Sequence, residues 1–262
     1  MPGNALNLEG ISVSFPGQGG SFQALAPLDL HVEGGRFISL IGPSGCGKST
    51  LFNVIAGLHV PTSGKVTIGG LDATGMIGMT GYMLQKDMLL PWRTVLDNVI
   101  LGLEIRGMSK PEAREKVLPY LRQYGLAGFE TKYPSALSGG MRQRAALLRT
   151  LLIDTDVILL DEPFGALDAQ TKAQMQDWLL QIWADFRKTV IFVTHDVDEA
   201  VYLSDEICVM ASRPGRVVEH ITVDLPRPRT RDLLRNTTFL DLKTRCLDLL
   251  SHPATPSETV FS

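Results

Sequence analysis

Residues 37–50 read FISLIGPSGCGKST, and this stretch decides the fold class. Residues 37–41 form a nearly continuous apolar run, which is typical of a short parallel strand buried on both faces. Apolar side chains with helical spacing follow over residues 49–57. A buried strand, a glycine-rich turn and a helix in succession predict an α/β fold with a mainly parallel core sheet.

The turn between strand and helix fits the pattern G-x-x-x-x-G-K-[ST] of a phosphate-binding loop. Its glycines let successive backbone N–H groups point inward around an anion, and the positive end of the following helix strengthens that field. Lys48 is expected to reach the β- and γ-phosphates, and the Ser49 hydroxyl to hold Mg²⁺, which prefers oxygen ligands. The predicted nucleotide-binding residues are Gly42, Pro43, Ser44, Gly45, Cys46, Gly47, Lys48, Ser49 and Thr50.

A second apolar run, residues 157–160, ends in two carboxylates, Asp161 and Glu162. Asp161 at a strand end suits a water-mediated contact to Mg²⁺, and Glu162 suits polarising an attacking water molecule. With the phosphate loop, this pair predicts a P-loop nucleoside triphosphatase. The sequence contains no NKxD motif, which disfavours a GTPase, whereas a small-molecule kinase remains open on these residues alone.

Residues 137–144, LSGGMRQR, resemble the signature motif of the ATP-binding subunits of ABC transporters. The Ser138 hydroxyl and the N–H groups of Gly139 and Gly140 form a second anion site at the positive end of a helix. A head-to-tail pair of chains uses both sites, because each signature segment then caps the ATP held by the other chain's phosphate loop. The resemblance extends over residues 6–225.

This resemblance assigns roles to further residues. Gln85 matches the glutamine that contacts Mg²⁺ and the attacking water, and His195 matches the histidine that contacts the γ-phosphate. Residues 166–168 match a loop that crosses the dimer interface. Phe15 matches the aromatic residue that stacks on adenine, with Phe22 as a rival and a core strand position as the alternative. The resemblance implies an ATPase that uses ATP and Mg²⁺, with catalytic residues Glu162, His195, Lys48 and Gln85 and metal-binding residues Ser49, Gln85 and Asp161.

The rest of the chain divides by pattern. Alternating apolar residues and glycine-rich turns over residues 4–35 predict an N-terminal antiparallel β subdomain. Residues 88–150 carry apolar residues three and four apart, which predicts a helical subdomain inserted into an ATPase domain of residues 1–225. Residues 226–262 form a C-terminal extension with a helix and then a loose tail. The expected helices cover residues 95–103, 111–124, 138–153 and 232–250.

The run LLPWRTV at residues 89–95 is too apolar for a free surface loop, which predicts a docking groove or, alternatively, a buried helix start. In ABC ATPases this region meets a short helix of the membrane permease. Together with residues 211–216 and 225–229, the run is similar to the nitrate/sulfonate/taurine importer subfamily. For the arginines of the extension, a solvated charged face is favoured over contact with lipid headgroups or a partner subunit.

The resemblance implies a subunit that energises an importer of small anionic or organic solutes by ATP-driven closure of a homodimer. Its implied partners are a second copy of the chain, permease subunits and, indirectly, an extracytoplasmic solute-binding protein. The implied location is peripheral, on the cytoplasmic face of the inner membrane. The alternatives are an importer of a thiamine-pyrimidine precursor and a soluble ABC ATPase of translation or DNA repair.

Composition excludes several other classes. Of 262 residues, 44% are hydrophobic and 20% charged, which predicts a packed core rather than a disordered chain. Lys and Arg total 25 against 28 Asp and Glu, a balance that argues against a non-specific nucleic-acid binder. No signal peptide and no run near the roughly 20 apolar residues of a spanning helix is expected. The three cysteines indicate neither a zinc site nor disulfides, and Cys46 is either a reactive thiol that ATP protects or a buried, inert one.

Overall fold

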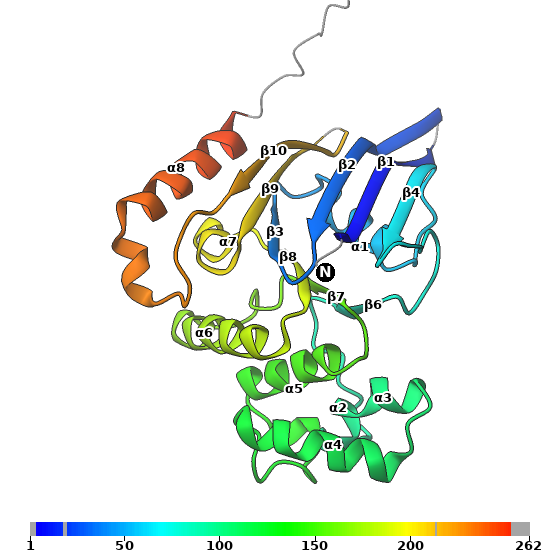
Figure 1. Ribbon diagram of the computed structural model, residues 1–262, viewed down its shortest axis with the longest axis vertical. Coiled ribbons are helices and arrows are strands. Elements are labelled where there is room, and N and C mark those ends of the chain that lie inside the picture. The colour runs from blue at the N-terminus through cyan, green and yellow to red at the C-terminus, as the bar shows by residue number, and fades with distance from the viewer. Residues whose placement is uncertain (1–3, 18–19, 213, 253–262) are drawn as a thin grey trace, which may run out of the picture. The chain divides into compact units, whose positions relative to one another are not determined.

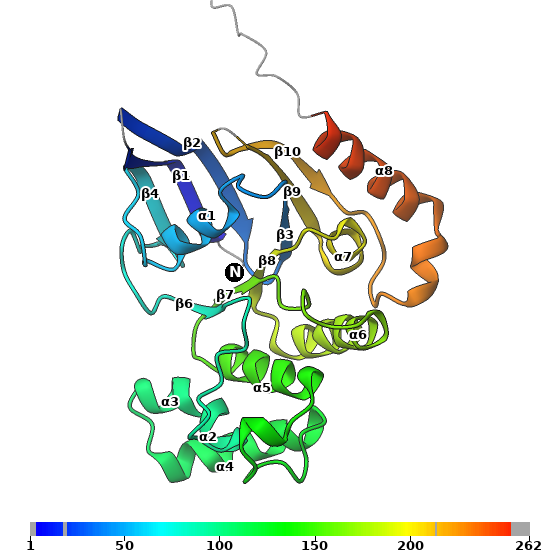
Figure 2. The ribbon, with the colours of Figure 1, turned by 180° about the vertical axis from the view of Figure 1, so that it is seen from behind.

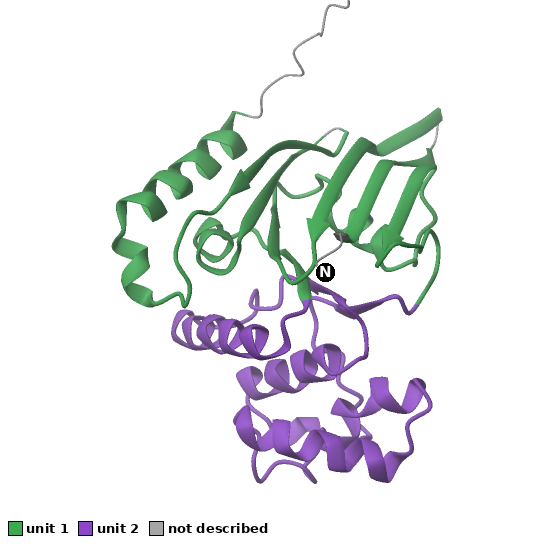
Figure 3. Ribbon diagram, viewed as in Figure 1, with its two compact units in different colours: residues 1–77, 189–262 green, residues 78–188 purple. Residues whose placement is uncertain are grey.

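The computed structural model describes residues 4–17, 20–212 and 214–252 (Figure 1). The chain divides into two compact units, the first made of residues 1–77 and 189–262 and the second of residues 78–188 (Figure 3). The loose tail expected after the last helix lies outside the described residues. The predicted domain boundaries, at residues 88, 150 and 225, stay predictions.

An antiparallel sheet opens the first unit. Its order is β2-β1-β4-β5, in which β1 (Asn4–Gly17) pairs with both β2 (Gly20–Glu33) and β4 (Ser63–Ile68), and β5 (Leu71–Asp72) forms the edge. Along β2, buried and exposed residues alternate from residue 28 to residue 33. The predicted N-terminal antiparallel strands, with one face in solvent, are therefore confirmed.

The first unit also contains strands in the order β10-β9-β3-β8, most of which are parallel. β3 (Phe37–Ile41) runs parallel to β8 (Thr189–Val193) and to β9 (Glu206–Ala211), while β10 (Arg216–Thr222) is antiparallel at the edge. Every residue of β3 and β8 is buried. These are the continuous apolar runs of the sequence, so the prediction of strands buried on both faces is confirmed.

Two helices follow the parallel strands directly: α1 (Lys48–Ile55) after β3 and α7 (Val197–Leu203) after β8. The last helix, α8 (Thr237–Ser251), lies beside α7 and β9 (Figures 1 and 2). It begins later than the predicted residue 232, because a 3₁₀ turn, η2 (Arg231–Arg235), precedes it. Asn236 caps the start of α8, since its side chain accepts a hydrogen bond from the Thr238 amide at 2.8 Å.

Arg229 corrects the predicted solvated charged face of the C-terminal extension. It is only 8% exposed, and its guanidinium donates hydrogen bonds to the carbonyls of Val201, Tyr202 and Ser204 at 2.7, 3.2 and 2.8 Å. These carbonyls lie at the C-terminal end of α7, where the regular hydrogen bonds of a helix run out. Burial lowers the pKa of Arg229 to about 10, which still leaves it charged at neutral pH.

Two neighbouring arginines also contact the end of α7 or the segment that follows it. Arg227 donates to the carbonyl of Leu203 and to the carboxylate of Asp205, each at 2.8 Å. The Arg231 guanidinium lies over the ring of Tyr202, 4.5 Å from its centroid. Arg227, Arg229 and Arg231 therefore cap and cover α7, whereas Arg235 is exposed as predicted.

The second unit contains two parallel strands that pair with each other, β6 (Thr80–Met83) and β7 (Val157–Asp161). Its helices are α2 (Val95–Val99), α3 (Leu101–Ile105), α4 (Lys110–Gln123), the 3₁₀ turn η1 (Pro134–Ala136), α5 (Gly139–Leu151) and α6 (Ala169–Phe186). Among the described residues of the whole chain, no helix combines the length and apolar character needed to cross a bilayer.

The helix predictions for this unit are largely confirmed. The predicted helix over 95–103 is instead divided at Ile100, where the amide of Leu103 bonds three residues back to the Ile100 carbonyl and tightens the turn. α4 begins at a capping box formed by Ser109 and Glu112, and α5 begins at the Ser138 cap.

Replacing Arg229 with alanine is expected to destabilise the protein by about 2–3 kcal/mol, because buried carbonyls at the end of α7 lose their donors. Thermal or urea unfolding measures the difference. Arg235, an exposed arginine of η2, supplies the matched control, and Arg235→Ala should change the free energy of unfolding by less than about 0.5 kcal/mol. Equal effects from the two substitutions would show that the cap contributes nothing.

Candidate active site

The phosphate loop joins β3 to α1 in the first unit. Lys48, the first residue of α1, is buried, and its ammonium donates to the carbonyls of Gly42 at 2.7 Å and Pro43 at 3.1 Å. These bonds hold the positive charge within the curve of the loop, at the positive end of α1. Pro43, Ser44 and Gly45 are exposed, so the outer part of the loop is accessible.

Close packing fixes the shape of this loop. Gly47 has a φ of +93°, and a Cβ there would lie 2.4 Å from Leu25 Cδ2. A Cβ on Gly42 would lie 2.6 Å from the sulfur of Cys46 and 2.7 Å from the carbonyl oxygen of Met210. Both positions therefore require glycine. The Cys46 side chain is fully buried, which favours the inert thiol over the reactive one.

His195 follows β8 at the sheet edge where the phosphate loop follows β3. Leu40 pairs with Val193 in the parallel register, and the Thr194 amide donates to the Leu40 carbonyl at 3.3 Å. The next residue, Asp196, caps α7 by accepting hydrogen bonds from two of its amides. His195 is thus fixed between a strand end and a helix start, with its side chain exposed.

Phe15 and Phe22 lie directly opposite each other on β1 and β2. They are 37% and 59% exposed, so neither is a core residue. The ring of Phe15 also contacts His59, with 5.0 Å between ring centroids and an interplanar angle of 39°. The structure thus leaves both aromatic residues accessible for stacking on a base.

In the second unit, β7 ends at Asp161 and the backbone turns sharply at Glu162. Glu162 has a φ of +44°, a left-handed conformation that costs a residue with a Cβ about 1–3 kcal/mol. Its carbonyl accepts from the Gly165 amide at 3.1 Å, and its carboxylate accepts from Gln85 Nε2 at 3.3 Å. The structure therefore brings together two predicted catalytic residues, Gln85 and Glu162.

Sequence reasoning missed Tyr82, whose hydroxyl donates a hydrogen bond to the Asp161 carboxylate. Burial, together with the charge and hydrogen bond of Asp161, raises the pKa of Tyr82 well above its usual range. The sequence held no signal for this contact, because only the pairing of β6 with β7 in the structure places Tyr82 and Asp161 on one face.

The signature segment opens α5. The Ser138 hydroxyl accepts from the Met141 amide at 3.3 Å, and Ser138 and Gly139 are exposed. Gln143, one turn further, donates to the Pro163 carbonyl in the turn after β7. A Cβ on Gly140 would lie 3.1 Å from the Thr171 side chain. The signature segment therefore packs beside the carboxylate turn and the start of α6.

Two arginines of α5 hold the segment that follows Gln85. Arg149 donates to the carbonyls of Asp87 and Met88 at 2.6 and 2.7 Å, and Arg142 pairs with the Asp87 carboxylate at 3.3 Å. The signature helix is thus bonded both to the turn after β7 and to the approach to the apolar run.

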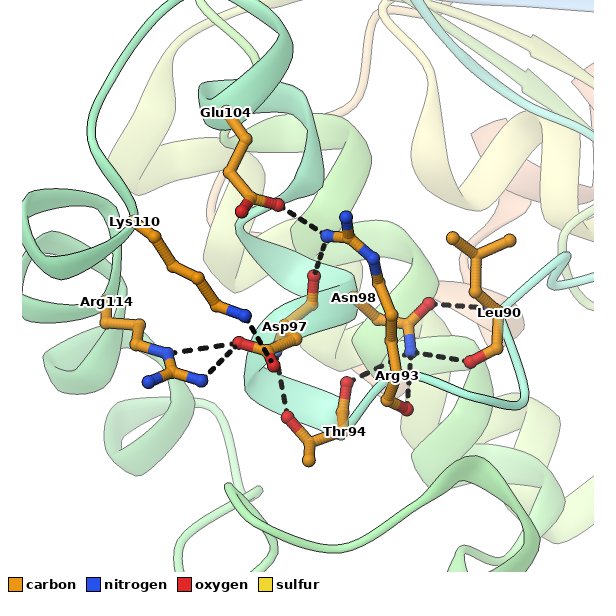
Figure 4. A network of polar contacts seen from close by, with 8 residues as sticks. All are labelled: Leu90, Arg93, Thr94, Asp97, Asn98, Glu104, Lys110 and Arg114. Carbon is orange, nitrogen blue, oxygen red and sulfur yellow. Dashed lines mark hydrogen bonds and ion pairs between the residues drawn. The ribbon is translucent and has the colours of Figure 1, made fainter.

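Asn98 organises the apolar run itself (Figure 4). This fully buried side chain accepts from the Leu90 amide at 2.7 Å and donates to the carbonyls of Leu90, Arg93 and Thr94 at 3.1, 3.1 and 3.0 Å. Trp92, within the loop so formed, is 72% exposed. The two alternatives for residues 89–95, a docking surface and a buried helix start, therefore each describe part of the run. The start of α2 is buried, whereas Trp92 faces outward.

Asp97 joins α2 to α4 in the same network (Figure 4). Its carboxylate pairs with Lys110 at 3.1 Å and Arg114 at 2.8 Å. Burial opposes ionisation of Asp97, but hydrogen bonds from Arg114 and Lys110 outweigh it and lower the pKa of the carboxyl group.

The donors fit Mg²⁺ that arrives with a nucleotide. Over the described ranges, no cluster of three or more His, Cys, Asp or Glu side chains could hold a metal ion. Mg²⁺ usually takes one or two protein oxygens and completes its shell with phosphate oxygens and water. The hydroxyl of Ser49 in the first unit and the carboxylate of Asp161 in the second are oxygen donors of this kind.

The profile of the ABC transporter family matches residues 25–165. The chain belongs to the ABC transporter family. An uncharacterised ABC transporter ATP-binding protein of Methanocaldococcus jannaschii is 46% identical over 94% of this chain and 91% of its own length. A taurine import ATP-binding protein of Yersinia pestis is 43% identical over 84% of each chain. A nitrate import ATP-binding protein of Synechocystis is 40% identical over 94% of each.

Solved structures agree with the sequence relatives. A dimeric bacterial ABC transporter cassette superposes with a TM-score of 0.73 at 31% identity, covering 84% of this chain and all of the other. The same cassette in a post-hydrolysis state, with ADP and phosphate bound, gives a TM-score of 0.72 over the same coverage. The predicted fold class and family are confirmed, and the roles of individual site residues stay predictions.

Replacing Asn98 with alanine is expected to loosen the loop around Trp92, because the Leu90 amide and three loop carbonyls lose their partner. Hydrogen exchange at the Leu90 amide should accelerate at least tenfold, which corresponds to about 1.4 kcal/mol of local stability. Amides in the middle of α4 serve as an internal control and should exchange at the parental rate. Uniform acceleration through the unit would instead indicate global destabilisation.

Proposed function

We propose that this chain is the ATP-binding and ATP-hydrolysing subunit of an importer, and that two copies close on ATP to drive transport. One observation carries the proposal: the first unit presents a phosphate loop with a buried lysine, and the second an exposed serine-capped helix start. Taurine and nitrate import ATP-binding relatives at 43% and 40% identity support an importer of small anionic or organic solutes.

Binding begins at the phosphate loop. The backbone N–H groups of residues 42–47 and the end of α1 attract the phosphates, and the Lys48 ammonium exchanges loop carbonyls for the β- and γ-phosphate oxygens. Ser49 and Asp161 supply oxygens for Mg²⁺, which neutralises phosphate charge when bound. Phe15 stacks on the adenine ring, consistent with its exposed face.

Hydrolysis needs a water molecule placed in line with the γ-phosphate. Glu162 polarises that water, and Gln85, bonded to Glu162 at 3.3 Å, orients it. His195 contacts the γ-phosphate from its exposed position after β8. Most of the rate then comes from positioning and charge stabilisation, as in other phosphoryl transfers.

The signature segment serves the ATP of a second copy. Ser138 and Gly139 are exposed, and the backbone N–H groups at the start of α5 form the positive end of that helix. A two-fold dimer therefore completes two sites at once, and loss of the γ-phosphate releases the copies. Dimeric cassettes of the same fold support this arrangement.

The exposed Trp92 binds to the permease subunits in the membrane. It is 72% exposed on a loop that Asn98 holds in one conformation, which lowers the entropic cost of binding. The chain is then peripheral, on the cytoplasmic face of the membrane, and a solute-binding protein acts on it only through the permease.

The variant Glu162→Gln is expected to bind ATP and to hydrolyse it at least a hundredfold more slowly, because the amide cannot accept the water's proton. ATP should convert this variant into a stable dimer, which light scattering after gel filtration detects. Lys48→Ala serves as the contrasting control, since it should lose nucleotide affinity in calorimetry. Parental hydrolysis by Glu162→Gln would remove Glu162 from the mechanism.

The variant Trp92→Ala is expected to weaken binding to permease subunits at least tenfold, because exposed tryptophans are common hot spots worth about 2 kcal/mol or more. Co-purification with co-expressed permease subunits measures this binding. Ile105→Ala removes another apolar side chain, 77% exposed, and should leave capture unchanged. Equal capture of the permease by the parental chain, Trp92→Ala and Ile105→Ala would exclude Trp92 as the docking residue.

A further inference from the structure

We propose that Tyr82 is a positioning residue for ATP hydrolysis, whose hydroxyl holds the Asp161 carboxylate in the orientation that serves the metal–nucleotide complex. The inference rests on the proposed function, because it assumes that Asp161 contributes to that complex. It adds a residue that neither the phosphate loop, the signature segment nor the catalytic glutamate accounts for.

Strand register places the two side chains together. β6 and β7 are parallel neighbours, and Tyr82 pairs with Leu159. Side chains alternate along a strand, so Leu159 and Asp161 lie on one face, which is the face of Tyr82. Two residues along a strand cover about 6.6 Å, a span that a tyrosine side chain bridges, and its hydroxyl reaches the Asp161 carboxylate.

The backbone beneath Tyr82 has little freedom. A Cβ on the preceding Gly81 would lie 2.7 Å from Ile158 Cδ1 and 2.9 Å from the Thr150 carbonyl oxygen. β6 therefore sits tightly between β7 and α5, and the phenol ring projects from a fixed point. A donor mounted on a rigid strand can set the orientation of a neighbouring carboxylate more tightly than one on a loop.

The chemistry of the pair is that of a neutral donor and an ionised acceptor. A tyrosine phenol carries its proton at neutral pH and can therefore donate to an adjacent carboxylate. Such a bond fixes which oxygen of the carboxylate faces outward.

The second carboxylate has a similar partner. Gln85, three residues beyond Tyr82, donates to Glu162 at 3.3 Å. β6 and its continuation thus supply one donor to each of two adjacent acidic residues. Tyr82 acts on the metal-binding carboxylate, and Gln85 acts on the carboxylate that polarises water.

The test is Tyr82→Phe, which removes the hydroxyl and keeps the ring. Loss of a partner that orients a metal-binding group typically costs about 10–100-fold in metal affinity. We expect Mn²⁺, detected by electron paramagnetic resonance with a non-hydrolysable ATP analogue, to bind at least tenfold more weakly. Nucleotide binding in EDTA should stay at the parental affinity, because the phosphate loop is intact.

Tyr124→Phe is the matched control, because it removes another tyrosine–aspartate hydrogen bond, the 2.6 Å contact to Asp185. It should leave Mn²⁺ affinity and the Mg²⁺ concentration for half-maximal hydrolysis unchanged. Thermal unfolding checks that both variants are folded. If Tyr124→Phe weakens Mn²⁺ binding as much as Tyr82→Phe does, the effect is general destabilisation and the inference is overturned.

Asp161→Asn separates failure of the inference from failure of the proposed function. If Asp161→Asn weakens Mn²⁺ binding and Tyr82→Phe does not, Tyr82 has no positioning role. If neither does, the metal-binding role of Asp161 fails, and the inference fails with it. In the supporting outcome, the double variant loses no more Mn²⁺ affinity than Asp161→Asn alone, because Tyr82 acts only through that carboxylate.

Discussion

The site depends on close packing around the phosphate loop. At Gly42 and Gly47 the strand, the loop and their neighbours approach so closely that a single methyl group would displace backbone or core side chains. This packing fixes the turn of the chain, in which the Lys48 ammonium donates to its own loop carbonyls. The shape of the proposed anion-binding loop is therefore a consequence of core packing.

In the second unit, one helix connects the elements that the proposed function uses. α5 begins at Ser138, bonds through Gln143 to the turn after β7, and bonds through Arg149 to the carbonyl of Met88. A single helix is therefore hydrogen-bonded to the turn after β7 and to the segment before the docking loop, and it begins at the signature serine.

The sequence predicted what local pattern determines. The phosphate loop, the buried strands and the capped start of α5 each follow from residues within a few positions of one another. Arg229 was misjudged and Tyr82 was missed, because their roles depend on partners far away in the chain: the end of α7 for Arg229 and Asp161 for Tyr82. Burial of Asn98 was likewise invisible, since a polar residue in an apolar helix start has no local signature.

Glu162 combines a strained, left-handed backbone conformation with a carboxylate that the proposed function needs. Glycine or asparagine would adopt this conformation with less strain, so either would relieve a cost of about 1–3 kcal/mol. Selection for stability alone would therefore not keep glutamate at this position. A Glu162→Gly chain would therefore be the more stable molecule, and it would lack the carboxylate to which Gln85 donates.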